Sequence, residues 1–378
     1  MAILSRDEAR TILEKVVAMS KADDCVANLG GGNDGNIRYA RNTVSTAGVT
    51  ENLSLGVTSS YGKKTGTATI NELDDASLEK VVRRSEELAK LSPENPEYMS
   101  PLGPQKYDEA KNYFESTAKI TPEDRTKAAE NSIVPSRKKD LVAAGFMEDY
   151  NGFGSMMNSK GLYAYDRSTG VDFTITVRTK DGTGSGYALR DYNDINKLDT
   201  AAATQIAMDK AAQSVDAKAL EPGKYTVILE PAASSGLIGN MMYSFAARSA
   251  DEGRSFLAKK GGGTKIGEQI VDDRITVYSD PLNAEVPTGT WSRSGLPRKK
   301  MAWIEDGVVK NLYYSRYWAK EKGKKATPFP SNIIIKGGDA SLEDLIKSTK
   351  KGILVTRTWY IRTVDPQTLL YTGLTRDG

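Results

Sequence analysis

Apolar and polar residues alternate along the first part of the chain with two periods, one typical of helices and one typical of strands. Apolar residues at helical spacing follow Ser5 and Glu8, which form a Ser-x-x-Glu capping box and predict an opening helix. The glycine- and asparagine-rich stretch 30–36 is expected to be a loop. The strands predicted after it are 36–41, 42–60 and 64–70. A second helix is predicted over 75–91, followed by a proline-rich, extended connector over 92–107.

A similar round of strands and helix follows. The predicted strands are 141–150, 153–179 and 186–192, and a helix from about 198 to 215 comes next. Both rounds contain the spacing V-x4-G-x3-G-x-A: Val57, Gly62, Gly66 and Ala68, then Val177, Gly182, Gly186 and Ala188. We interpret the rounds as a duplicated unit of β-meander and helix, although glycine-rich hairpins could produce the spacing by coincidence.

The last third of the chain predicts short strands joined by tight turns. Asp306-Gly307, between strand-like flanks, is the signal of a type I′ hairpin, and a short helix is predicted near 341–350. The predicted fold class is therefore α+β. An N-terminal domain, residues 1–220, would consist of antiparallel β-meander plus helix units, and residues 221–378 would form a mostly β C-terminal domain.

The chain stops on a turn signal, Arg376-Asp377-Gly378, directly after the strand-like residues 368–375. A polypeptide that ends on a turn leaves the returning strand unmade and one sheet edge bare. We therefore expect the C-terminal domain to be truncated.

Composition narrows the class of protein. Lys and Arg number 52 against 49 Asp and Glu, a net charge of +3, and the basic runs are short and scattered, so we expect no nucleic acid partner. Cys25 is the single cysteine, which excludes an internal disulfide and fits a reducing compartment. The N-terminus lacks the character of a signal peptide, and no window approaches the roughly 18 apolar residues of a membrane span. We expect a cytoplasmic protein that does not enter a membrane.

The sequence contains no histidine, which excludes much of the usual catalytic chemistry. Neither a Ser-His-Asp nor a Cys-His site can form, and no imidazole can bind zinc. A carboxylate site for magnesium or calcium stays open. Its best candidates are the pairs Asp23-Asp24, Asp74-Asp75 and Asp272-Asp273. Each pair lies beside a turn or a helix start, where acidic residues are common, and no calcium-loop motif frames them.

Ser-Lys catalysis needs no histidine, and the pattern Ser-x-x-Lys occurs at Ser77/Lys80, Ser136/Lys139 and Ser348/Lys351. This short pattern arises by chance in a chain rich in both residues, and the three lysines fall on predicted surfaces, so we assign them no role. The aromatic pair Trp359-Tyr360, with Arg357 and Arg362 nearby, alternates along a predicted strand. It could line a peptide groove or pack a core.

Several long, distinctive strings carry a resemblance that covers nearly the whole chain. They are TGTATINELDDASLEKVVRRSEELAKL, LEPGKYTVILEP, ARSADEGRSF, GGGTKIGE, SGLPRKKMAWIEDGVVKNLYYSRYWA and GILVTRTWYIRTVDPQTLLYTGLTRDG. In these strings the chain resembles the TldD/PmbA family, also called modulators of DNA gyrase. The resemblance implies a peptidase system in which a TldD-type subunit holds zinc through an H-E-x-x-x-H helix and a more distal cysteine. A PmbA-type subunit, also called TldE, lacks this motif and pairs with it.

The resemblance also places the metal motif on this chain. Counted from Leu-Glu-Pro, the two histidine positions fall on Asn240 and Phe245, and the glutamate position falls on Met241. A neutral amide is a poor zinc ligand, a phenyl ring cannot bind zinc, and a thioether cannot act as a general base. The motif is therefore degenerate, with no catalytic or metal-binding residue expected here. Met241, Met242, Tyr243 and Phe245 are expected to serve packing instead.

The resemblance thus implies a PmbA/TldE-like, catalytically degenerate subunit of a cytoplasmic TldD-type metallopeptidase complex that degrades or processes peptides. Zinc is expected in a TldD-type partner and no cofactor in this chain. The dimer would form with that partner or with a second copy of the chain. An extended peptide would be held by main-chain hydrogen bonds to a sheet edge. Two alternatives stand: an active hydrolase with an unrecognised carboxylate metal site, and a non-proteolytic binding or assembly protein.

Overall fold

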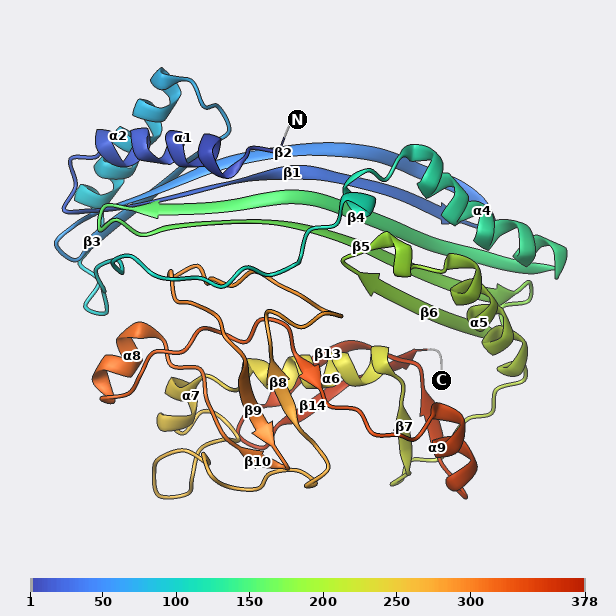
Figure 1. The fold of residues 1–378 in the computed structure, drawn as a ribbon. Coiled ribbons are helices and arrows are strands. Elements are labelled where there is room, and N and C mark those ends of the chain that lie inside the picture. Colours follow the sequence, from blue (N-terminus) through green and yellow to red (C-terminus); the bar gives the residue numbers. More distant parts are fainter. Residues whose placement is uncertain (1–2, 377–378) are drawn as a thin grey trace.

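The computed structural model describes residues 3–376, and a long antiparallel sheet dominates its N-terminal part (Figure 1). The six strands stand in the order β3-β2-β1-β4-β5-β6. Their bounds are β1 Asp24–Ala40, β2 Thr43–Tyr61, β3 Lys64–Ile70, β4 Leu141–Asn158, β5 Tyr163–Thr179 and β6 Ser185–Tyr192. The two predicted rounds of strands therefore meet where β1 pairs with β4.

Helices cover one face of this sheet. Their bounds are α1 Arg6–Met19, α2 Asp75–Leu91, α3 Glu115–Ala118, α4 Pro122–Lys138 and α5 Thr200–Gln213, with a 3-10 helix, η1, at Ile195–Lys197. One core, which includes Leu13 and Leu29, packs α1 and α2 on the sheet, and a second, which includes Ile133 and Phe173, packs α4 and α5. The strand residues that enter these cores recur with a period of two, as one face of a sheet requires.

The two rounds have the same element order, α1-β1-β2-β3-α2 and α4-β4-β5-β6-α5, on either side of the central strand pair. Their shared glycines have corresponding environments. Gly62 and Gly182 adopt positive φ angles of 56° and 77° in the hairpin turns. Gly66 and Gly186 lie against the backbone of the helix that follows each round. The two hairpins pair in different registers, but the arrangement supports the interpretation of a duplicated unit.

The close approach at Gly66 can be tested directly. A Cβ on this residue would lie 2.2 Å from the Ala89 nitrogen and 2.5 Å from the Ser85 carbonyl oxygen, so α2 would have to move. We expect Gly66→Ala to lower the free energy of unfolding by about 1–3 kcal/mol, the range of overpacking. The matched control is Gly48→Ala in β2, where a Cβ meets nothing within 4 Å. Chemical denaturation compares the variants, and equal stabilities would contradict this contact.

The loop predicted over 30–36 is wrong. These residues form the middle of β1, where Gly32 pairs with Asn52 on one side and Gly152 on the other. A Cβ on Gly32 would lie 2.6 Å from the Asn151 carbonyl oxygen. The glycines are therefore present because neighbouring backbone approaches closely, not because the chain turns.

Several other predicted features are confirmed. The Ser5–Glu8 capping box precedes α1, and α2 spans the predicted residues. Asp306 and Gly307 have φ angles of 49° and 76°, as a type I′ turn requires, and connect β9 to β10. Among residues 3–376, none of the helices combines the length and apolar character needed to cross a lipid bilayer.

The C-terminal part lies against the other face of the large sheet (Figure 1). Its helices are α6 Pro231–Tyr243, α7 Ala247–Asp251, α8 Arg316–Glu321 and α9 Leu342–Ser348. Its strands are β7 Val227–Leu229, β8 Val277–Ser279, β9 Met301–Glu305, β10 Val308–Val309, β11 Ile334–Ile335, β12 Ile353–Val355, β13 Arg357–Asp365 and β14 Leu370–Arg376. The mixed α+β class with a β-rich C-terminal part is confirmed.

The small sheets of this part are β10-β9-β8-β11, the parallel pair β12-β7 and the antiparallel pair β13-β14. The domain division between residues 220 and 221 stays a prediction. The terminal turn predicted at 376–378 extends outside the described residues, whereas the strand predicted before it is present as β14 and pairs with β13.

Candidate functional site

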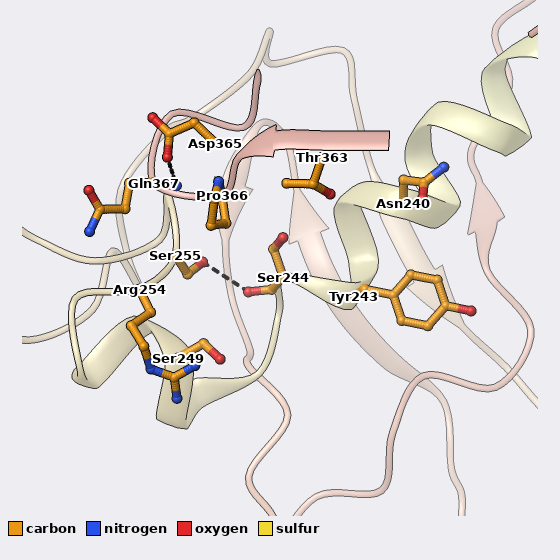
Figure 2. Close-up of a pocket in the computed structure, with 10 residues that line it drawn as sticks. All are labelled: Asn240, Tyr243, Ser244, Ser249, Arg254, Ser255, Thr363, Asp365, Pro366 and Gln367. Carbon is orange, nitrogen blue, oxygen red and sulfur yellow. Dashed lines mark hydrogen bonds between the residues drawn. The ribbon is translucent and has the colours of Figure 1, made fainter. Parts of the chain in front are cut away.

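The helix on which the resemblance places the metal motif is present as α6. It begins with Pro231 at its first turn, a position that proline favours. A cavity of about 730 Å³ opens beside its C-terminal end (Figure 2). The lining residues are Asn240, Tyr243, Ser244, Ser249, Arg254, Ser255, Thr363, Asp365, Pro366 and Gln367. In this view Asn240 and Tyr243 project from α6, and Thr363 projects from β13.

The predicted motif positions separate into two environments. Met241 and Phe245 are buried, together with Met242, in a core that also contains Trp303. Asn240 lines the cavity, and its Nδ2 donates a hydrogen bond of 2.7 Å to the Gly236 carbonyl one turn earlier. Packing is therefore confirmed for the two methionines and the phenylalanine. The packing role predicted for Tyr243 is wrong, because this side chain is 72% exposed.

These side chains do not fit a zinc ion. The Phe245 ring offers no ligand atom, Met241 offers only a buried thioether, and Asn240 offers a neutral amide. In the part of the chain that the structure describes, no group of three or more His, Cys, Asp or Glu side chains is placed to hold a metal ion. The side chains at the motif positions therefore do not form a set of zinc ligands.

The acidic pairs considered as carboxylate sites each have a local structural role. Asp24 pairs with Lys160 at 2.7 Å, and Asp74 caps the N-terminus of α2. Asp272 pairs with Arg274, also at 2.7 Å. Because these carboxylates already have partners, they explain turn and helix geometry rather than a metal site.

The nucleophile candidates are likewise engaged elsewhere. Burial raises the pKa of the Cys25 thiol to about 11, so the reactive thiolate is scarce at neutral pH. The serines of the Ser-x-x-Lys patterns donate their hydroxyls to other groups: Ser77 to Glu72, Ser136 to the Ser132 carbonyl and Ser348 to the Leu345 carbonyl. These contacts leave the patterns without an activated nucleophile.

The aromatic pair on β13 lies at the surface. Trp359 and Tyr360 are 44% and 56% exposed, so the core alternative for them is wrong. Tyr360 has a φ of 52°, and the strand register shifts between Trp359 and Arg362, which breaks the predicted alternation. Arg357 has a different role, because its guanidinium lies 3.6 Å over the Tyr187 ring of β6 and joins β13 to the large sheet. The peptide groove stays a prediction.

A second cavity, of about 760 Å³, follows six consecutive residues of β6, 187–192. β6 is the outermost strand on its side of the large sheet. The first turn of α6 lies across the cavity. Lys210 of α5 forms an ion pair of 2.5 Å with Glu230, the N-cap of α6, and donates to Thr356 at 3.1 Å. An edge strand beside a cavity is the geometry by which proteins bind extended peptides as added strands.

Carboxylates gather on the sheet face that lies opposite the helices. Glu148, Asp172 and Asp191 are cross-strand neighbours on β4, β5 and β6. Burial, reinforced by the charges of Asp191 and Glu148, raises the pKa of Asp172 to about 6. Burial also raises the pKa of Asp166 on β5 to about 6, with Arg298 opposing the shift. Of these side chains, Asp166 is half-buried, whereas Glu148, Asp172 and Asp191 remain exposed.

Asp166 gives a pH-dependent prediction. Its pKa is raised from 3.8 to about 6, so its stabilising contribution is complete below about pH 4 and is lost as the pH rises through 6. An amide does not titrate. We therefore expect Asp166→Asn to raise the free energy of unfolding by about 1–3 kcal/mol at pH 8 relative to its effect at pH 4. Urea unfolding at both pH values measures this, and a pH-independent difference would contradict the burial argument.

Comparison with known families decides the identity of the chain. Three family models match it in succession: PmbA/TldA metallopeptidase domain 1 over residues 29–89, the central domain over 102–220 and the C-terminal domain over 222–378. The chain belongs to the TldD/PmbA metallopeptidase family. The resemblance to this family, inferred from the sequence strings, is confirmed.

Relatives within the TldD/PmbA family include two proteins of Methanocaldococcus jannaschii. An uncharacterised protein is 28% identical over 308 residues, which cover 77% of this chain and 69% of the relative. A metalloprotease is 22% identical over 372 residues, which cover 91% and 79%.

Solved structures show the same fold. TldE from Thermococcus kodakarensis is 20% identical with a TM-score of 0.81, covering 93% of this chain and 82% of that one. A Bacteroides thetaiotaomicron protein described as a candidate modulator of DNA gyrase is 18% identical with a TM-score of 0.83, covering 98% and 90%. The latter coverage does not support the C-terminal truncation expected from the sequence.

Proposed function

We propose that this chain is the PmbA/TldE-like, catalytically degenerate subunit of a cytoplasmic TldD-type metallopeptidase complex. The observation that carries the proposal is the state of α6. Met241 and Phe245 are buried in a core, Asn240 bonds its own helix, and the sequence has no histidine. Zinc and the hydrolytic step would then come from a TldD-type partner.

An exposed apolar surface on the β13-β14 pair supports a protein partner. Large apolar side chains stand exposed along these two strands: Trp359, Tyr360, Val364, Leu370 and Leu374. Apolar patches of this kind are typical of interaction surfaces. The structural likeness to TldE supports a TldD-type chain as the partner, with a second copy of this chain as the alternative.

The cavity along β6 supports a role in holding peptide. Residues 187–192 form an edge that offers main-chain hydrogen bonds, and α6 lies on the opposite side. A peptide bound there in extended form would be recognised mainly through its backbone. In the proposed complex, this chain positions the peptide and the partner cleaves it.

Reconstitution tests the proposal. The purified chain, a TldD-type chain from the same genome and their mixture are each incubated with an unstructured peptide, and cleavage is followed by mass spectrometry. We expect no peptide cleavage by this chain alone, and more cleavage by the mixture than by the partner alone. A Glu→Gln change in the partner's H-E-x-x-x-H motif should abolish it.

Two results would overturn the proposal. Cleavage by this chain alone that a chelator abolishes and zinc restores would favour the active hydrolase. If no TldD-type chain co-purifies with this chain and none changes its own cleavage rate on mixing, the non-proteolytic assembly protein is favoured.

A further inference from the structure

The first half of β5 has an edge that faces a cavity. β6 pairs with β5 only from Val171 to Arg178. Within residues 3–376, the segment 163–169 therefore has β4 on one side and no strand on the other. A cavity of about 420 Å³ lies along this edge, between β5, the start of α1 and the connector before α3. This volume falls within the range of small-ligand and peptide pockets.

The backbone groups of this edge point into the cavity. The Thr169 amide donates a hydrogen bond of 3.0 Å to the Asn112 carbonyl, so it is directed away from β4. Because backbone hydrogen bonds alternate in direction along a strand, the amides and carbonyls of Tyr163, Tyr165 and Arg167 point the same way. In the described part of the chain, no other backbone group bonds to these three residues on that side.

Arg167 adds an unpaired, positioned cation at the end of this edge. Its guanidinium carbon lies 3.5 Å from the centre of the Tyr113 ring, and this cation–π contact fixes the position of the guanidinium. Among residues 3–376, its Nε is buried without a hydrogen-bond partner, and the guanidinium forms no ion pair with a carboxylate. A buried donor without an acceptor is unfavourable, and a planar guanidinium is suited to a carboxylate.

We propose that this edge binds an extended peptide segment that carries a carboxylate. The peptide backbone would bond to Tyr163, Tyr165 and Arg167 as an added strand, and its carboxylate would pair with the Arg167 guanidinium. Asp108, Glu109 and Asp166 also line the cavity. Arg6 lines it as well but pairs with Glu109 at 3.9 Å, so among the described lining residues Arg167 is the cation that is left to attract a negative charge. This inference goes beyond the proposed function because it needs neither a partner chain nor cleavage.

Binding to the isolated full chain tests this site. The probe is an acetylated and amidated pentapeptide, Thr-Val-Glu-Val-Thr, compared by calorimetry with its Gln counterpart. We expect the Glu peptide to bind about tenfold tighter, and Arg167→Gln to abolish that preference while leaving Gln-peptide binding unchanged. N-methylation of alternate peptide amides should weaken both peptides. An all-neutral peptide with a free C-terminus shows whether a terminal carboxylate can replace the side chain.

Arg10 provides the matched control. Its guanidinium also lies near a β5 tyrosine, 5.4 Å from the Tyr163 ring, but it pairs with Glu14 and does not line the cavity. Arg10→Gln should therefore keep the Glu preference. The proposal is overturned if neither peptide binds, if wild type binds both equally, or if Arg167→Gln keeps the preference. Such a failure leaves the proposed partnership intact, because cleavage tests that partnership separately.

Discussion

Replacing Arg125 with alanine will lower the free energy of unfolding by about 3–5 kcal/mol, because the buried carboxylate of Asp149 loses its counter-charge. The Nε and Nη2 atoms of Arg125 lie 2.5 and 2.8 Å from the two carboxylate oxygens. The two side chains are only 7% and 8% exposed. A Cβ on Gly35 would lie 1.7 Å from the Arg125 Nη2, so this ion pair also explains a glycine of β1. One contact thus fixes α4 on β4.

Two controls separate burial from charge pairing. The double variant Arg125→Met/Asp149→Leu should lose less stability than Arg125→Ala, because no uncompensated charge remains in the core. Lys127→Ala removes an exposed ion pair on the same helix, with Glu130 at 2.7 Å, and should cost less than about 1 kcal/mol. Urea unfolding of all three variants makes the comparison. A loss for Arg125→Ala no larger than that for Lys127→Ala would contradict the buried pair.

The second large effect is expected at the end of α6. Phe245→Ala should lower the free energy of unfolding by about 3–5 kcal/mol, because the ring is fully buried in the C-terminal core. Asn240→Ala should cost less than about 1 kcal/mol, since its side chain lines a cavity and bonds only the Gly236 carbonyl. Chemical denaturation measures both variants.

If α6 held a metal site instead, the stability of the chain would depend on zinc. Zinc bound to the folded state would raise the melting temperature of the wild type, and Asn240→Ala would remove the increase. Packing predicts the same melting temperature with and without zinc for both proteins. Thermal unfolding with added zinc and with a chelator distinguishes the two.

Much of the helical structure could be predicted because its signals are local. The Ser5 and Asp74 caps and the apolar period behind them determine where α1 and α2 begin. By contrast, α4 was not predicted. Its buried face consists mostly of small or polar residues, and Pro135 lies within it, so the apolar period is weak. The available signal was the capping box at Thr121 and Asp124.

Features that depend on distant neighbours could not be predicted. The glycines of β1 have the composition of a loop, and only the contacts with Asn52 and Asn151 explain them as a strand. Tyr360 follows the period of a buried strand, but the irregular register of β13 places it at the surface.

Some features of the candidate site could likewise be predicted from the sequence, and others could not. The sequence resemblance pointed to α6, whereas its split between a core and a cavity required the structure. The pairing of Arg167 with Tyr113 joins a strand to a distant connector, and no motif marks it. A cation stacked on an aromatic ring therefore emerges only from tertiary structure.

The central claim is that this chain does not hold the catalytic zinc, and its zinc affinity tests that claim most directly. The isolated chain and a TldD-type partner are each titrated with zinc against a chromophoric chelator of known affinity. We expect competitive, stoichiometric binding by the partner and none by this chain. One zinc bound tightly by this chain and released by Asn240→Ala, together with peptide cleavage that depends on it, would contradict the account.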